Sequence, residues 1–193
     1  MLTVDTPYVA RKAGAPLPSV LGKGVIPELD ARDASNPALQ HAPDLTPADM
    51  ARLAEVSGLP VVTKGVLRAD EALRCLDSGA AAVVVSSHGG RQLDGVIGVP
   101  WALAEVAEAV GDRGEVYADG GIRTGVDVLR AMALGARAVM LGRPVLWGPA
   151  VGGAAGVSAV LNDLRAEFIE ALALAGCASC ADVGPDLVLL ASR

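Results

Sequence analysis

The chain has 193 residues, a length that suits one domain with a substantial hydrophobic core. Its formal net charge of −6 argues against a general affinity for nucleic acid. Hydrophobic residues make up 52% of the chain, but Gly, Arg or Asp interrupt the longest apolar runs, so we expect no membrane-spanning segment and no membrane partner. The N-terminal residues lack a basic stretch followed by an apolar one, so we expect no signal peptide.

Three cysteines, Cys75, Cys177 and Cys180, lack the number and spacing of a disulfide framework, which favours a reducing compartment and a cytoplasmic protein. Cys177 and Cys180 have C-x-x-C spacing, but they follow an expected helix end rather than join a strand to a helix. We therefore favour ordinary thiols over a redox motif. His41 is isolated from other metal-ligating residues, so no metal site is expected.

In chain order, a short strand at 2–5 is followed by prolines, glycines and scattered charges that indicate a flexible loop at 13–45. Beyond this loop, helical and strand patterns alternate. The expected helices cover 46–57, 70–78, 101–110, 124–134 and 157–175, and the further strands cover 60–64, 81–86, 115–119 and 137–141. This alternation predicts right-handed crossovers, a parallel sheet and one α/β domain over 1–193.

Polar residues gather where the strands are expected to end. The groups are Lys64, Ser86 to Arg91, Asp119 to Arg123, and Gly142 with Arg143. Active-site loops lie at this edge in both α/β barrels and open sheets. No G-x-G-x-x-G motif opens a helix after the first strand, which argues against a dinucleotide-binding Rossmann domain.

The loop after the strand at 81–86 carries one imidazole and one guanidinium. His88 can move a proton near neutral pH, and Arg91 can hold a carboxylate through two parallel hydrogen bonds. A surface loop with an unrelated His and Arg is the alternative, and the residue types alone do not decide between the two.

The loops that begin at Asp119 and at Gly142 have the composition of a phosphate site. Glycine lets backbone N–H groups approach an anion closely, and Arg123 and Arg143 add positive charge. Each loop alone could be a tight turn with a solvated arginine. Two such loops in consecutive units favour the phosphate site.

These motifs, in this order, resemble the C-terminal half of the FMN-dependent α-hydroxy acid oxidases and dehydrogenases. The matching motifs are Leu-Pro-Val-Val-Thr-Lys-Gly-Val, Val-Ser-Ser-His-Gly-Gly-Arg-Gln-Leu-Asp, Asp-Gly-Gly-Ile-Arg and Leu-Gly-Arg-Pro-Val, between Leu59 and Leu187. The opening Leu-Thr-Val-Asp-Thr-Pro resembles the family's fourth barrel strand. The resemblance implies an incomplete TIM (β/α)8 barrel that contains strands four to eight.

The resemblance also implies roles in catalysis and substrate binding. His88 would be the active-site base, and Asp5 would pair with it and stabilise its charged form. Arg91 would bind the substrate carboxylate. Lys12 stands where the family usually has a second arginine for that carboxylate, and lysine cannot reproduce a bidentate guanidinium contact.

FMN is the cofactor that the resemblance implies. Lys64 would lie beside the flavin where negative charge grows on reduction, and Thr3 and Ser86 would hydrogen-bond the flavin. Asp119 would hold the ribityl chain. The phosphate region would be held by Gly120, Gly121, Ile122, Arg123, Gly142 and Arg143.

The implied activity is oxidation of a small L-2-hydroxy acid, of the lactate, glycolate or mandelate class, to the 2-keto acid. The alternative is an inactive fragment, or a half-barrel that works only in a complex. A different reaction in an FMN barrel is less favoured, because a base beside a carboxylate clamp suits a hydroxy acid.

The main departure from the family is length, because a whole barrel needs roughly 250 residues. Five parallel strands cannot close a barrel and leave two edges open. We therefore expect the chain to form a homo-oligomer or to be completed by a missing N-terminal half.

Overall fold

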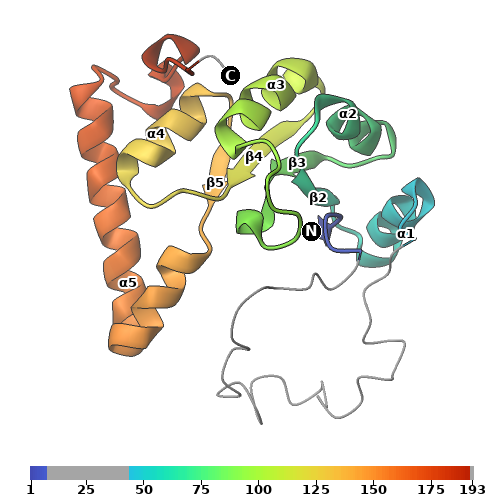
Figure 1. The fold of residues 1–193 in the computed structure, drawn as a ribbon, viewed down its shortest axis with the longest axis horizontal. Helices are drawn as coiled ribbons and strands as arrows, with labels where there is room; N and C mark the ends of the chain where they lie inside the picture. The colour runs from blue at the N-terminus through green and yellow to red at the C-terminus, as the bar shows by residue number, and fades with distance from the viewer. Residues whose placement is uncertain (8–43, 192–193) are drawn as a thin grey trace.

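A computed structural model describes residues 1–7 and 44–191 (Figure 1). Lys12, His41 and all but the last two residues of the loop expected at 13–45 lie outside these residues. The strands are β1 (Leu2–Thr3), β2 (Val62–Val66), β3 (Ala82–Val85), β4 (Glu115–Asp119) and β5 (Ala138–Met140). The helices are α1 (Pro47–Ser57), α2 (Ala69–Asp77), α3 (Val99–Val110), α4 (Gly125–Ala133) and α5 (Arg143–Leu174), with 3-10 turns η3 (His88–Gly90), η4 (Gly111–Arg113), η5 (Cys180–Asp182) and η6 (Pro185–Leu187).

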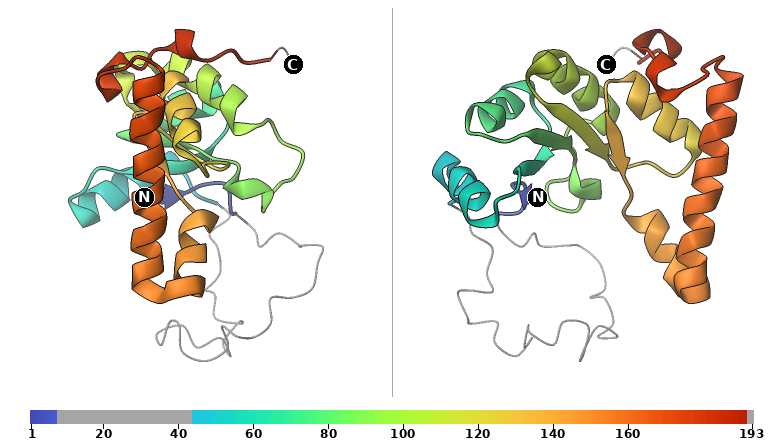
Figure 2. Two further views of the ribbon diagram at one scale, coloured as in Figure 1. Left: turned by 90° about the vertical axis from the view of Figure 1, so that its left-hand side faces the viewer. Right: turned by 180° about the vertical axis from the view of Figure 1, so that it is seen from behind.

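The five strands form one sheet in the order β1-β2-β3-β4-β5, and every neighbouring pair is parallel. This confirms the predicted parallel α/β fold. The helices α2, α3 and α4 lie along one side of the sheet, as right-handed crossovers require (Figures 1 and 2). Within residues 1–7 and 44–191, the sheet therefore ends at β1 and β5, and the outer edges of these two strands have no partner strand.

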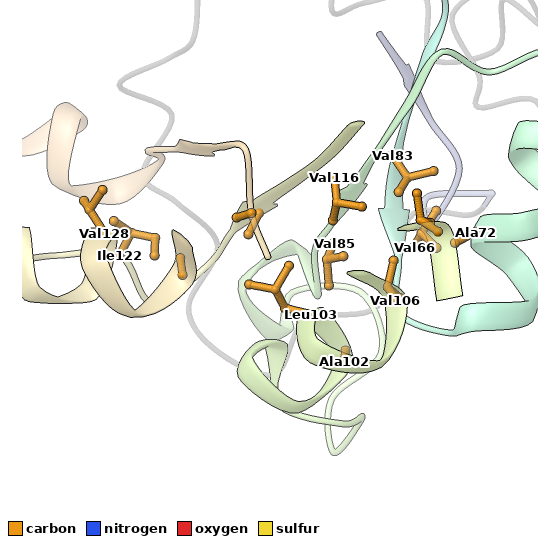
Figure 3. Packing of buried hydrophobic residues seen from close by; sticks show 14 residues of the cluster. Val66, Ala72, Val83, Val85, Ala102, Leu103, Val106, Val116, Ile122 and Val128 are labelled. Carbon is orange, nitrogen blue, oxygen red and sulfur yellow. The ribbon is translucent and has the colours of Figure 1, made fainter. Parts of the chain in front are cut away.

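The main hydrophobic core lies between the sheet and these helices (Figure 3). All four residues of β3 are buried, as expected for a β-branched run covered on both faces. The apolar face of α3 packs against them through Ala102, Leu103, Val106 and Val110. Strand β3 and its neighbours are thereby held firmly, and their carboxyl ends carry the polar residues described below.

Two helix starts show the capping that their sequences predict. Thr46 and Asp49 form a capping box at α1, and Thr124 and Asp127 form one at α4. In both, the aspartate accepts hydrogen bonds from the backbone N–H of the threonine and from its hydroxyl. These boxes fix where the two helices begin.

Helix α5 differs from the sequence prediction, which began the last helix at residue 157. It starts at Arg143, because a proline is tolerated in the first helical turn. Non-helical backbone at Gly152 and Gly153 then divides it into two segments, which meet at an angle in Figures 1 and 2. The segments touch where Gly156 lies against the carbonyl of Gly148. The glycines and prolines between residues 143 and 156 therefore lie within a helical hairpin.

Helix α5 is also long and apolar enough to cross a membrane, by length and composition alone, with a mean hydropathy of 1.4 over 18 residues. The sequence prediction that no apolar segment has this length was wrong, because it treated the glycines as ends of the segment. Only 6% of this apolar window is buried. The break at Gly152 and Gly153 nevertheless divides the 32 residues into two shorter rods.

Candidate active site

Three polar side chains from neighbouring strands meet at the carboxyl edge of the sheet. The Nζ of Lys64, in β2, lies 2.7 Å from Oδ2 of Asp119, the last residue of β4. The same ammonium donates a hydrogen bond of 2.9 Å to Oγ of Ser86, directly after β3. The Lys64 and Asp119 side chains are only 15% and 17% exposed, so this ion pair is largely withdrawn from water.

The second carboxylate oxygen of Asp119, Oδ1, is buried and has no hydrogen-bond partner among residues 1–7 and 44–191. A buried acceptor without a partner is costly and marks a position where a donor is expected. A ligand hydroxyl could satisfy it. The cluster formed by Lys64, Ser86 and Asp119 thus offers a cation, a hydroxyl and a free acceptor at one place.

The Asp5–His88 pair joins the end of β1 to the loop after β3. Nδ1 of His88 lies 3.3 Å from Oδ1 of Asp5, and the side chains are 33% and 17% exposed. Because a carboxylate only accepts hydrogen bonds, this arrangement favours the tautomer in which Nδ1–H donates a hydrogen bond to Asp5 and Nε2 is left as an acceptor. Ser86 connects the pair to the cluster, because its Oγ accepts a hydrogen bond of 3.1 Å from the backbone N–H of His88.

His88 has a φ of 52°, the only positive value among the described residues other than glycine. Gly89 and Gly90, which follow it, also have positive φ. This unusual turn directs the chain away from β3 at once and holds the imidazole over the end of the sheet. Backbone conformations of this kind concentrate at functional sites.

Arg91, in the loop after β3, and Arg143, at the start of α5, are both exposed. Arg91 ends η3, and its guanidinium has no partner within the described part of the chain. Arg143 reaches from the start of α5 to the histidine loop, where its Nη2 lies 3.2 Å from the position that a Cβ on Gly89 would occupy. The structure therefore brings Arg143 beside the loop that carries His88.

The two candidate phosphate loops differ in which N–H groups are free. At α4, the backbone N–H groups of Arg123 and Thr124 already donate to Asp127 Oδ2, at 3.1 and 3.0 Å. At α5, the first turn has no acidic residue and no side-chain cap, and the space beside Gly142 is open. The start of α5 is therefore the better anion site.

Ile122, which the sequence placed in the phosphate loop, packs its side chain in the main hydrophobic core. The neighbouring glycines, Gly120 and Gly121, have φ values of 89° and 81°, and nothing lies within 4 Å of a Cβ placed on Gly121. A Cβ on Gly120 would meet Val99 at 3.6 Å, so within this glycine pair Gly121 alone leaves open space.

Two cavities flank the site. One of about 1040 Å³ is lined by the β1 segment, including Thr3 and Asp5, by Ser86 and Ser87, and by α1 and α2. The other, of about 660 Å³, is lined by Gly120, Gly121 and Arg143 together with the C-terminal segment 188–191. Trp101 anchors that segment by donating a hydrogen bond of 3.1 Å from Nε1 to the carbonyl of Ala191.

Some contacts of the site had no signal in the sequence. The approach of Arg143 to Gly89 and the ion pair between Lys64 and Asp119 both join segments that are distant along the chain. Cys177 is buried and Cys180 is exposed, and both are free thiols. The described residues contain no group of three or more His, Cys, Asp or Glu able to hold a metal ion.

Comparisons with known proteins agree with this geometry. A sequence model of the family described as FMN-dependent dehydrogenase matches residues 1–190. An L-lactate oxidase from Nostoc sp. is 53% identical over 146 residues, which cover 76% of this chain and 40% of the relative. Human 2-hydroxyacid oxidase 1 is 40% identical over 204 residues, with 97% of this chain and 55% of the relative covered.

Solved structures give the same result. The structure of mandelate oxidase with (S)-2-phenylpropionate has a TM-score of 0.76 and 40% sequence identity, and the match covers 94% of this chain and 52% of that one. A lactate oxidase from Pediococcus acidilactici has a TM-score of 0.74 and 39% identity over 80% of this chain and 43% of that one. The chain therefore spans about half the length of the relatives it matches, which fits the predicted incomplete barrel.

Proposed function

Because the chain belongs to the FMN-dependent dehydrogenase family, we propose that it supplies the FMN site and the catalytic base of an enzyme that oxidises an L-2-hydroxy acid to the 2-keto acid. One observation carries the proposal. The Asp5–His88 pair and the Lys64–Ser86–Asp119 cluster share one edge of the sheet and are joined through Ser86. The matched relatives and the intact polar motifs favour this activity over an inactive fragment.

The residues of the cluster fit FMN. Asp119 Oδ1 needs a donor, which a ribityl hydroxyl provides, and Lys64 offers positive charge where a reduced flavin carries negative charge. Ser86 and Thr3 supply hydroxyls along the same edge. Arg143 and the uncapped start of α5 suit the phosphate. When bound, FMN supplies the electron acceptor for the oxidation.

The protein residues would bind the substrate and move its proton. With Nδ1–H directed at Asp5, His88 Nε2 is free to take a proton from the hydroxy acid, and the carboxylate stabilises the imidazolium that results. Arg91 has its guanidinium free to pair with the substrate carboxylate. A charged clamp and a base on one loop require a substrate with an acid group close to its hydroxyl.

We also propose that a further segment completes the barrel. The sheet ends at β1 and β5, and the first half of α5 exposes apolar side chains, among them Leu146 at 67%, Trp147 at 53% and Val151 at 86%. Unpaired strand edges beside an apolar surface favour pairing with another segment. Three further βα units, as in the part of the relatives that this chain does not match, would cover both. A homo-oligomer is the alternative occupant.

The experiment is an FMN titration followed by anaerobic reduction. The chain is loaded with FMN, with and without the N-terminal half of the Nostoc L-lactate oxidase, and exposed to glycolate, L-lactate or (S)-mandelate. We expect saturable FMN binding in both cases and flavin bleaching when the N-terminal half is present, with no bleaching by D-lactate. Failure of every L-hydroxy acid to bleach the completed protein would contradict the proposed activity.

Sedimentation separates the two ways of covering the open edges. We expect one chain to combine with one N-terminal half, with loss of any self-association. A stable homo-oligomer that excludes the N-terminal half would contradict completion by that segment.

A further inference from the structure

Strand β2 contains an irregularity beside the Asp5–His88 pair. Lys64 pairs with Val84 and Val66 pairs with Val85, so Gly65 is an extra residue in the register with β3. Its φ is 107°, a conformation that side chains other than glycine rarely adopt. A bulge of this kind redirects the strand locally, and bulges are common next to active sites.

The bulge also brings Gly65 against Asp5. A Cβ placed on Gly65 would lie 2.4 Å from Cγ, 2.5 Å from Cβ and 2.6 Å from Oδ1 of Asp5. Oδ1 is the same oxygen that faces His88 Nδ1 at 3.3 Å. The carboxylate that orients the imidazole therefore occupies the space that a side chain at position 65 would fill.

Asp5 has little freedom to move away from such a side chain. The backbone N–H of Val4 donates a hydrogen bond of 2.8 Å to the carbonyl of Lys64, and Thr3 pairs with Lys64 in the sheet. These bonds hold the two backbones together directly before the contact. The Asp5 Cβ itself lies 2.5 Å from the position of the new methyl group, so rotation of the carboxylate cannot relieve the contact, and a side chain at position 65 must displace Asp5 together with its carboxylate.

Gly79 shows what backbone conformation alone demands. Its φ of 94° is close to that of Gly65, but nothing lies within 4 Å of a Cβ placed on it. It lies in the turn between α2 and β3, at the opposite end of β3 from His88. Gly79 therefore shares the backbone requirement of Gly65 and lacks the contact with a site residue.

We propose that Gly65 is a positioning residue, whose missing side chain lets Asp5 hold the His88 imidazole with its proton on Nδ1. The inference rests on the proposed function for its role in catalysis, and on the structure alone for its geometry. Replacement of Gly65 by alanine should displace Asp5 and move its carboxylate away from Nδ1. Without that acceptor, no hydrogen bond stabilises the Nδ1–H tautomer of the neutral imidazole, and the Nε2–H tautomer becomes populated.

The test reads the tautomer directly by ¹H–¹⁵N NMR of the imidazole rings, at a pH where the rings are neutral. The chain has only two histidines, so a sample with ¹⁵N-labelled histidine gives two ring patterns, and His88→Gln assigns them. We expect the Nδ1–H tautomer of His88 in the wild-type chain. Gly65→Ala and Asp5→Ala should both shift it toward Nε2–H, to the same extent.

The control is Gly79→Ala, which adds the same methyl group at a similar φ and should leave the His88 pattern unchanged. The double variant Asp5→Gly/Gly65→Ala should match Asp5→Gly alone, because all the Asp5 atoms that the new methyl group would meet are then absent. A folded Gly65→Ala variant with the wild-type pattern would overturn the proposal. A further shift in the double variant would do so as well.

If Gly65→Ala does not fold, the double variant Asp5→Gly/Gly65→Ala decides. Recovery of folding supports the proposal, because the Asp5 atoms that the new methyl group meets have been removed. If folding does not recover, glycine is needed at position 65 for its backbone conformation alone, and the proposal is overturned. All these NMR measurements are made without substrate, so they test the geometry independently of the activity. If the tautomers are as expected but no hydroxy acid reduces the completed, FMN-loaded protein, the result contradicts the proposed function and not this geometry.

Discussion

The middle of the sheet and its two edges are built differently, although both contribute to the site. Strand β3 is fully buried and α3 contributes four buried residues to the core, whereas β1 has two residues, neither of them buried. Helix α5, beyond β5, buries only Gly148 and Ala171 in 32 residues. The middle is therefore stabilised within this chain, and the edges leave surface for something else to cover.

The site follows the same division. Lys64, Ser86 and Asp119 come from the three middle strands and are mostly buried. Asp5 and Arg143 come from the two edges, after β1 and β5. The proposed flavin contacts thus lie on the stable part of the fold, while Asp5, the partner of the proposed base, and Arg143, the proposed phosphate contact, depend on the edges.

The largest effect is expected where the middle and an edge meet, at His88. In the completed protein, His88→Gln should lower the rate of flavin reduction by about 10² to 10⁴-fold, because general base catalysis is lost. FMN affinity should be unchanged, since the Lys64 cluster remains. Stopped-flow reduction and an FMN titration measure the two quantities. Reduction at the wild-type rate would show that proton transfer does not depend on this residue.

The contrast in packing should appear as a contrast in stability. Leu103 in α3 is 1% exposed, and Leu103→Ala should lower the free energy of unfolding by about 2–5 kcal/mol in urea. The matched change Leu146→Ala, at 67% exposure in α5, should stay within about 0.5 kcal/mol. Equal losses at the two positions would mean that the edge is packed as firmly as the middle.

The phosphate contact tests the edge at β5. Arg143→Ala should weaken FMN binding roughly 10- to 100-fold, the range for one hydrogen bond to a charged group. Arg137→Ala is the control, because Arg137 directly precedes β5, at the opposite end of that strand from Arg143, and is 73% exposed. A titration by flavin fluorescence measures both affinities. An Arg143→Ala variant that binds FMN as tightly as Arg137→Ala would remove this edge from the cofactor site.

The smallest effect concerns α1, which lies next to the β1 edge and buries only Met50. The hydrogen bond from the Thr46 hydroxyl lowers the pKa of Asp49 below its usual value of 3.8. The charged form therefore stabilises the folded helix at pH values above 3.8, and this contribution disappears as the pH falls through the lower, folded pKa.

Hydrogen exchange of the α1 amides measures this contribution. In Asp49→Asn, the protection of the α1 amides should be lower than in the wild-type chain near neutral pH. It should also no longer decrease as the pH falls through the pKa of Asp49. Glu55→Gln, in the same helix, makes the same change of charge without a capping role. Similar protection in the two variants near neutral pH would show that the capping box does not stabilise α1.

The middle of the fold could be predicted from the sequence because each of its elements has a local signal. The β-branched run at 82–85 ends at polar residues, and Thr124 with Asp127 marks a helix start. The α5 hairpin could not be predicted in this way. Pro149 and the glycine pair usually end helices, and only the packing of one segment on the other shows that helix continues on both sides.

The residue types of the site could be predicted from motifs, but its contacts could not. The motifs and the family resemblance predict Asp5, His88, Lys64 and Asp119 as site residues, and the structure places them at one edge of the sheet. It gave no sign that Gly65 leaves room for the Asp5 carboxylate, because that contact depends on a bulge in β2 and on the register of β1. Contacts between distant segments follow from the fold and have no local pattern.

The left-handed backbone of His88 and the chemistry proposed for this residue favour different amino acids at the same position. At a φ of 52°, glycine carries no steric cost, and asparagine and aspartate are among the better tolerated alternatives. Only histidine, which is also enriched in this region, offers a base that works near neutral pH. Glycine would meet the backbone requirement there without steric cost, so a histidine in this conformation is explained by the proposed role of His88 as the base and not by the backbone.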